Sequence, residues 1–287
     1  MASRSPKIPF QSPTRLARQV IIGRVRAVFN DQARGEKPVI RSPNSMFGQE
    51  TLIWRVHGDV ITMMVGGIAA LLLQMLHPAV LGGVWDHSDF REDMLGRLRR
   101  TARFISMTTF GPAEDAEAAI ARVRSVHANV SGHLPDGTAY AASDPKLLAW
   151  VHVTEAVSFL DSWIRYGNAD LSAADQDRYF EDMARIARAL GADPVPENRA
   201  AAEQLLQAMR VELRSDARTR EVAHIVTTQR PDNAIEALVQ GMIVDAAVDL
   251  LPPWAREMHG LTTSSIKRPL VRAGTLGAAR TLRWAFR

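Results

Sequence analysis

The hydrophobic and polar positions along this chain follow the period of an α-helix in most segments. The longest apolar run, residues 60–76, contains only two polar side chains, Thr62 and Gln74. It is marginally short for a membrane span, which needs about 20 residues. Its central pair Gly66-Gly67 also weakens it as an isolated helix. We therefore expect a buried central helix here.

Proline and glycine mark the ends of the expected helices. A glycine-rich turn is expected at 80–84, after His77-Pro78, because proline ends the preceding helix. No segment alternates regularly between apolar and polar residues, and no internal repeat is visible. The sequence predicts an all-α fold, a single helical domain of eight to ten helices. Its clearest helical segments are 15–29, 52–76, 89–109, 113–131, 146–166, 171–190, 197–216 and 232–250.

The charges are distributed unevenly along the chain. Residues 1–42 carry nine Lys and Arg against two acids, and residues 254–287 carry seven against one, although the net charge is only +4. We interpret 1–42 as a basic arm with an amphipathic helix, 43–262 as the helical domain and 263–287 as a basic tail. The ends either pack on the acidic body or make peripheral contact with a membrane surface.

Several classes of protein are disfavoured by composition and motif. The chain has no cysteine, which excludes disulfides, thiolate haem ligands and cysteine-bound zinc or iron–sulfur sites. It has no nucleophile elbow, Walker loop, dinucleotide fingerprint or His-Glu-x-x-His motif. The basic ends carry few aromatic residues, so we expect no nucleic-acid partner. The N-terminus lacks the apolar core of a signal peptide. We expect a cytoplasmic protein, with a peripheral membrane location at the inner face as the alternative.

One histidine shares the apolar face of its expected helix. Ile120, Val123, His127 and Val130 recur at helical spacing within 113–131, so the His127 imidazole should point inward. A buried imidazole either finds a hydrogen-bond partner or binds a metal. Spacing alone leaves both interpretations open.

An arginine and a hydroxyl lie one helical turn apart in the segment 89–109. Arg97 and Thr101 share a face and could bind an anion. The alternative is that Arg97, Arg99, Arg100 and Arg103 form a solvated basic face.

Two further groups of polar residues could bind metal. His77, Asp86 and His87 flank the expected glycine turn, but their spacing does not place them on one helical face. His152 and Glu155 are three positions apart on a helix, which suits a hydrogen bond or half of a metal site.

Six short segments carry a family resemblance when they are read in order over about residues 50–165. They are LLQMLHPAV from Leu72, GVWDHSDF from Gly83, Arg97-x-x-x-Thr101, VRSVHANVSG from Val123, YAASDP from Tyr140 and LAWVH from Leu148. Each segment alone is weakly specific, whereas the ordered set is more so. The chain resembles the rubber-oxygenase family of bacterial latex-clearing proteins and the fungal mycophenolate-pathway oxygenase.

The resemblance implies a globin-like helical core around haem b, with His127 as the proximal iron ligand. It places Arg97 and Thr101 near the haem, where they support cofactor binding or catalysis. His77, in the first of the matching segments, joins the cofactor-binding candidates. The family's distal carboxylate cannot be aligned to one acidic residue here, and Arg100 stands where the family offers a lysine.

The predicted function is therefore a haem b-dependent oxygenase that activates O2 to act on a small apolar or isoprenoid-like substrate. The reaction type implied by the resemblance is dioxygen cleavage of a carbon–carbon double bond. The alternative is a non-catalytic or non-haem helical protein that binds an apolar ligand, associated with a membrane through its basic ends.

Overall fold

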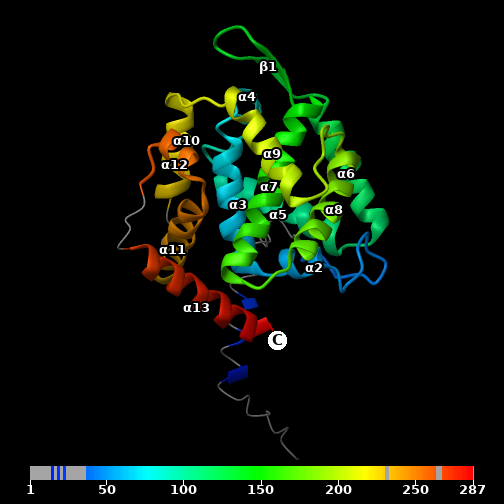
Figure 1. Ribbon diagram of the computed structural model, residues 1–287, viewed down its shortest axis with the longest axis vertical. Helices are drawn as coiled ribbons and strands as arrows, with labels where there is room; N and C mark the ends of the chain where they lie inside the picture. The colour runs from blue at the N-terminus through cyan, green and yellow to red at the C-terminus, as the bar shows by residue number, and fades with distance from the viewer. Residues whose placement is uncertain are drawn as a thin grey trace, which may run out of the picture.

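The computed structural model describes residues 14–15, 18–19, 22–23, 37–229, 233–262 and 267–286. Most of the amphipathic helix predicted at 15–29 lies outside the described residues. Figure 1 shows helices packed side by side, with one short hairpin projecting from the body. The predicted all-α fold is confirmed.

The described residues form twelve α-helices, more than the eight to ten expected. They are α2 (Leu52–His57), α3 (Val60–Gln74), α4 (Pro78–His87), α5 (Met94–Phe110), α6 (Ala113–His127), α7 (Pro145–Tyr166), α8 (Ala173–Leu190), α9 (Arg199–Met209), α10 (Ala217–Thr228), α11 (Ala234–Leu250), α12 (Pro253–His259) and α13 (Arg268–Phe286). A short 3₁₀ helix, η2, covers Arg210–Glu212, and the strands are β1 (Ser131–His133) and β2 (Ala139–Ala141).

Part of the higher helix count comes from the segment predicted as one helix over 52–76. It is broken at Gly58, where α2 ends, and Asp59 then caps α3 by accepting a hydrogen bond from the Thr62 backbone N–H at 3.0 Å. A carboxylate at this position satisfies a backbone donor that the new helix leaves free. α3 itself is buried along most of its length, as the sequence predicted for a central helix.

The glycine-rich turn expected at 80–84 is wrong, because these residues belong to α4. Pro78 occupies the first turn of α4, where its fixed φ favours the helix. Gly82 is needed for packing rather than for a turn, since a Cβ atom there would lie 3.1 Å from the Tyr140 ring.

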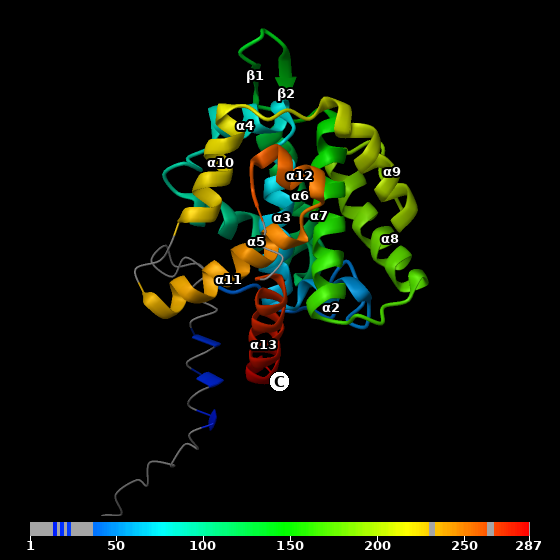
Figure 2. The same cartoon turned by 60° about the vertical axis from the view of Figure 1, so that its left-hand side comes forward.

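The helix expected over 113–131 ends at His127, four residues early, and the chain then forms a hairpin that the sequence did not predict. β1 and β2 pair antiparallel, with Gly132 opposite Tyr140. Gly137 makes the turn with a φ of +86°, a conformation that favours glycine. Figure 2 shows this hairpin standing at one end of the molecule, opposite α13.

The helices α3 and α7 form the centre of the molecule and pack against each other (Figures 1 and 2). Helices α8 and α9 flank α7 on one side, and α11 and α13 cover α3 on the other. Gly66 lets the two central helices approach closely, because a Cβ atom there would lie 2.8 Å from the Ser158 carbonyl oxygen and 2.9 Å from Phe159 Cα.

Ion pairs fasten the basic helix α13 to acidic residues of the body. Arg283 Nε donates to Asp59 Oδ2 at 2.5 Å, and Arg272 Nε donates to Asp249 Oδ2 at 2.7 Å. Asp59 and Asp249 are both buried. Since a buried carboxylate must be paired or hydrogen-bonded, these contacts position α13 across the ends of α3 and α11.

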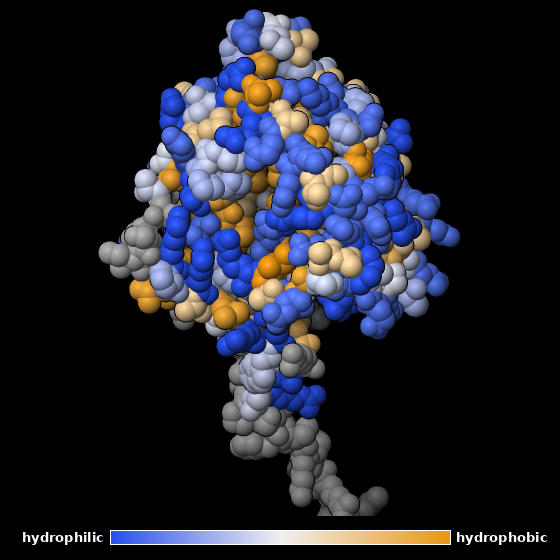
Figure 3. Space-filling model, in the orientation of Figure 1, coloured by the Kyte–Doolittle hydropathy of each residue, from blue (hydrophilic) through white to orange (hydrophobic). Residues whose placement is uncertain are grey.

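In the described part of the chain, no single helix is long and apolar enough to cross a membrane. Among the described helices, only α3 and α4 taken together have the length and composition of a candidate membrane span, and they are bent by 104° relative to each other. On the face drawn in Figure 3 the surface is mostly hydrophilic, and apolar residues appear in small groups among polar ones.

Candidate functional site

A cavity lies between α5, α6, α7 and α8 and has a volume of about 70 Å³. Four of its lining side chains can bind protons or metals, namely His57, His127, His152 and Glu155. The other described lining residues are mostly apolar, and they include Phe104, Ile105, Leu148, Phe159, Met183 and Leu190. We call this the α5–α8 cavity. It brings together histidines that are as much as 95 positions apart in the sequence.

His127 lines this cavity from the last residue of α6. Ile120 is buried on the same helix face, and Val123 and His127 are half-buried, so the face predicted to point inward does so. Burial lowers the pKa of His127, and the nearby positive charge of Arg97 lowers it further. The imidazole is therefore neutral at pH 7, which is the form that binds a metal ion.

Arg97 lies close enough to His127 to affect its pKa, but neither Arg97 nor Thr101 is among the described residues that line the cavity. The Arg97 side chain is half-buried, and its pKa is lowered by burial and by Arg100. Thr101 is exposed, and its hydroxyl donates to the Arg97 carbonyl oxygen at 3.3 Å. The structure thus pairs Arg97 with His127 and leaves Thr101 on the outer side of α5.

His152 and Glu155 face the same cavity from one side of α7. His152 is buried, and its Nε2 has no hydrogen-bond partner among the described residues. Burial lowers the pKa of His152 to about 4 and raises the pKa of Glu155 to about 7, against an opposing hydrogen bond from Gln74. The sequence suggested this pair, but the cavity that joins it to His127 depends on tertiary packing.

His57 was not singled out by the sequence, and its role in the structure is to connect three helices. Its Nδ1 is 2.7 Å from the Thr109 hydroxyl of α5, and its Nε2 is 3.1 Å from the Tyr179 hydroxyl of α8. Burial lowers the pKa of His57 to about 3, so the ring is neutral. With both ring nitrogens engaged, His57 is held as a structural hydrogen-bonding residue.

His77 is not among the residues that line the α5–α8 cavity in the described structure. It is buried at the start of α4, beside Trp150, with its Nε2 3.8 Å from Glu212 Oε2. Burial lowers the pKa of His77 despite the attraction of Glu212. The cofactor role expected for His77 therefore has no geometric link to His127.

The predicted metal group of His77, Asp86 and His87 is also dispersed. Asp86 Oδ2 accepts a hydrogen bond from the Tyr140 hydroxyl at 2.6 Å, and His87 Nε2 lies 3.0 Å from the Ser131 carbonyl oxygen. Across the described residues, no three His, Asp or Glu side chains gather closely enough to hold a metal ion by themselves. A single ligand such as His127 suits a metal whose remaining ligands come from a macrocycle.

The α5–α8 cavity is smaller than the pockets of about 300–1,000 Å³ that bind small molecules. A macrocycle enters only if α5 and α6 move away from α7 and α8. These two helices are loosely packed, since α6 buries only Ala116 and Ile120, and α5 buries only residues near its two ends. Segments with few buried side chains open at the lowest free-energy cost. The imidazole donor of the site suits a haem, whereas the cavity as observed is too small to hold one.

The chain matches one family of known proteins. A family model described as "ER-bound oxygenase mpaB/B'/Rubber oxygenase, catalytic domain" matches residues 54–284, which include every helix from α3 to α12. The chain belongs to this family of oxygenase catalytic domains. No curated protein and no solved structure gave a significant match.

We expect Glu155→Gln to change how stability depends on pH. Because the folded-state pKa of Glu155 is raised to about 7, the unfolded chain ionises this carboxyl first as the pH rises from 4.5. Wild type should therefore lose stability relative to the variant between pH 4.5 and 7. The difference should reach roughly 2 kcal/mol, after a discount for the residual exposure of the side chain.

Urea unfolding of both proteins at pH 4.5, 6 and 8 measures this difference. His152 has the opposite pH dependence, with stability rising from pH 4 to 6.5, but it contributes equally to both proteins and cancels. If the two stabilities run parallel over the whole range, the surroundings of Glu155 do not raise its pKa.

Proposed function

We propose that this chain is a haem b-dependent oxygenase that uses O2 to act on a small apolar or isoprenoid-like substrate. The proposal is carried by one observation: His127, kept neutral by burial and by Arg97, faces an apolar cavity in a chain of an oxygenase family. Haem b would be held there by the His127 ring from α6.

Each nearby side chain has a separate task in this proposal. His127 would coordinate the iron, and Arg97 would keep the imidazole deprotonated and available as a ligand. Bound haem supplies the activation of O2 that protein side chains cannot provide. The positive charge of Arg97 would also pair with an anionic group at the edge of the site.

On the α7 side of the cavity, Glu155 would exchange a proton and His152 would form a hydrogen bond. With a pKa of about 7, Glu155 can take up or release a proton near neutral pH, as a general acid or base must. His152 stays neutral, and its unpartnered Nε2 can hydrogen-bond a group that enters the cavity. Together they would add one proton-exchanging group and one hydrogen-bonding group to the α7 wall of the cavity.

The apolar lining would select the substrate. Phe104 and Ile105 from α5 face Met183 and Leu190 from α8 across the cavity. Such a wall excludes water and favours hydrocarbon over polar substrates, and methionine adapts to irregular shapes. By polarity, a short isoprenoid chain would suit this lining.

Oxygen uptake tests the proposed function. The haem-reconstituted full chain is mixed with geranylgeraniol or squalene, O2 consumption is followed with an electrode, and carbonyl products are sought by mass spectrometry. The proposal expects substrate-dependent uptake with cleaved products. Substrate binding without any O2 consumption would contradict it and would favour an apolar-ligand carrier instead.

Arg97→Gln should lower this oxygenase rate by roughly 10- to 100-fold, the usual effect of losing a residue that supports a metal ligand. Arg100→Gln on the same helix is the matched control, because Arg100 is exposed and forms an ion pair with Asp93 at 3.9 Å rather than acting on His127. If both variants lose activity equally, the effect belongs to the charge of α5 rather than to Arg97.

A further inference from the structure

A second cavity lies on the other side of the central helices and has a volume of about 350 Å³. It opens between α3, α7, α9, α11, α12 and α13, away from His127. This size falls within the range of small-molecule pockets, about 300–1,000 Å³. We call it the α11–α13 cavity.

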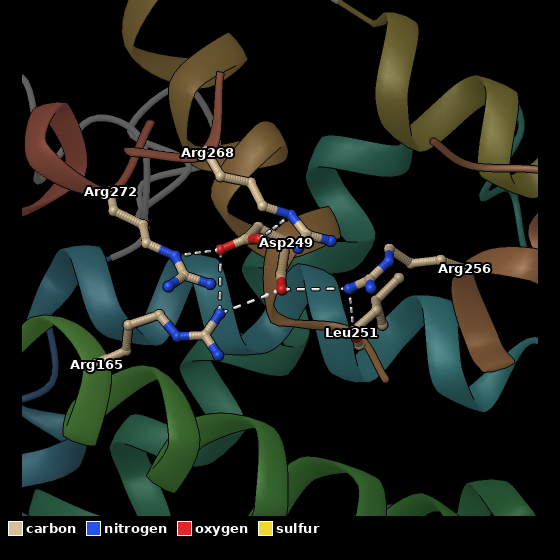
Figure 4. A network of polar contacts seen from close by, with 6 residues as sticks. All are labelled: Arg165, Asp249, Leu251, Arg256, Arg268 and Arg272. Carbon is tan, nitrogen blue, oxygen red and sulfur yellow. Dashed lines mark hydrogen bonds and ion pairs between the residues drawn. The ribbon is translucent and has the colours of Figure 1, made fainter. Parts of the chain in front are cut away.

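Four arginines line the α11–α13 cavity around one buried carboxylate, Asp249 (Figure 4). Arg165 comes from α7, Arg256 from α12, and Arg268 and Arg272 from α13. They converge from three elements that are far apart in the sequence. The cluster is therefore produced by the tertiary fold rather than by a run of basic residues.

The contacts show how the cations share Asp249. Arg272 Nε donates to Oδ2 at 2.7 Å, Arg165 Nη1 donates to the same oxygen at 3.3 Å, and Arg268 Nε lies 3.1 Å from Oδ1. The last contact is an ion pair without hydrogen-bond geometry, so Oδ1 is left without a hydrogen bond among the described residues. Arg256 instead donates to the Leu251 carbonyl oxygen at 2.6 Å.

The cluster has more positive charge than its own carboxylate can neutralise. The only other acidic residue among the described lining residues is Asp161, which is paired with Arg199 of α9. Among the described lining residues, the four guanidinium groups and Asp249 together carry a net charge of +3. Burial and the charge of Arg268 lower the pKa of Arg256, whereas the hydrogen bond to Asp249 raises the pKa of Arg272.

Docking of α13 does not require this excess. One buried carboxylate is satisfied by two well-placed guanidiniums, and α13 is held independently by Arg283 and Asp59. Asp249 is only 2% exposed in its side chain, whereas Arg165, Arg268 and Arg272 are 31%, 37% and 48% exposed. The carboxylate is thus covered, while the guanidiniums also reach toward the open cavity.

The other wall of the cavity is apolar. Ala69 and Leu73 of α3, Val157 of α7 and Leu206 of α9 line it, together with Leu250 and Pro252. A ligand that fills the cavity therefore needs an anionic end and a short apolar part.

We propose that the α11–α13 cavity binds the phosphate group of a small amphipathic phosphoester, with Arg165, Arg256, Arg268 and Arg272 as its anion-binding residues. A phosphate group carries about 1.5 to 2 negative charges at pH 7 and accepts paired hydrogen bonds from guanidinium groups. It balances the excess charge better than a carboxylate with a single charge. This proposal does not depend on haem or on the α5–α8 cavity.

Isothermal titration calorimetry on the full chain tests the proposal with two probes that share one stem, hexyl phosphate and hexanoate. We expect hexyl phosphate to bind to wild type and hexanoate to bind at least about 10-fold more weakly, because a charged hydrogen-bond pair is lost. Equal affinities, or no binding of hexyl phosphate at millimolar concentration, would overturn the assignment to phosphate.

Variants place the binding in this cavity. Arg272→Gln and Arg256→Gln should each weaken hexyl phosphate binding by roughly 10-fold or more. Arg280→Gln is the matched control, since Arg280 is exposed on α13 and does not line the cavity. Arg256 lies on α12, so its variant tests the site even if Arg272→Gln releases α13. Equal affinity in wild type and both test variants would overturn the proposal.

Asp249→Asn separates a binding site from a structural clamp. It removes the competing anion at nearly constant volume, so a phosphate site should bind hexyl phosphate more tightly. A cluster that serves only to dock α13 would lose thermal stability and gain no affinity. Binding to vesicles of phosphatidylcholine with and without phosphatidic acid then identifies the source of the phosphate. If the chain binds only the vesicles that contain phosphatidic acid, the ligand is a lipid headgroup. If it binds neither kind of vesicle, the ligand is a soluble phosphoester.

Discussion

Replacing Gly66 by alanine should lower the free energy of unfolding by about 3 kcal/mol, at the upper end of the cost of overpacking a core. The added Cβ would lie 2.8 Å from the Ser158 carbonyl oxygen and 2.9 Å from Phe159 Cα. Both atoms belong to the backbone of α7, which cannot rotate away as a side chain can. The two central helices would have to separate along their contact, and every apolar pair between them would loosen.

Gly67→Ala is the matched control for this prediction. The added Cβ would meet only Phe159 Cε1, at an ordinary distance of 3.7 Å. This variant should keep the wild-type stability or gain up to about 1 kcal/mol from the better helix propensity of alanine. Urea unfolding monitored by circular dichroism gives both values. Equal stabilities for the two variants would show that α3 and α7 are not in close backbone contact at Gly66.

His127→Ala should abolish haem binding while the fold is retained. The imidazole is the proposed axial ligand, so its loss should cost more than the roughly 10- to 100-fold that removal of an outer-shell partner costs a metal site. His127 is half-buried at the end of α6, and alanine is a good helix former, so we expect little change in unfolding. Absorption titration with haemin measures the affinity of each protein.

His133→Ala provides the control, because this histidine is exposed on β1 only six positions later. It should bind haemin as wild type does. Equal haemin affinity in wild type and the His127 variant would remove His127 as the ligand. His152→Ala then becomes informative, because His152 is buried in the same cavity and its Nε2 has no hydrogen-bond partner among the described residues.

The helical architecture could be predicted because its signal is local. The period of apolar residues, the proline at 78 and the glycine at 191 each act within a few positions, and they placed most helices correctly. The hairpin was missed because strands of three residues are too short to show an alternating pattern. α4 was predicted as a turn because consecutive glycines such as Gly82 and Gly83 are typical of turns. In the structure they instead make room for the Tyr140 ring, which packs against them.

The sequence could predict the candidate site only where the residues concerned lie on one face of a single helix. The inward direction of His127 follows from its spacing with Ile120 and Val123. His127 lies near Arg97 because α5 packs on α6, and the spacing of residues within one helix does not show this packing. His57 is held by Thr109 and Tyr179, which are 52 and 122 positions away, so no local pattern could reveal its partners. The arginine cluster around Asp249 could not be predicted either, because its members are far apart in the sequence.

Titration of the purified wild-type chain with haemin, followed by absorption spectroscopy, shows whether the chain binds haem. We predict a sharp Soret band that saturates at one haem per chain, together with a rise in unfolding temperature as haem binds the folded state. A spectrum that remains that of free haemin, with an unchanged unfolding temperature, would contradict it.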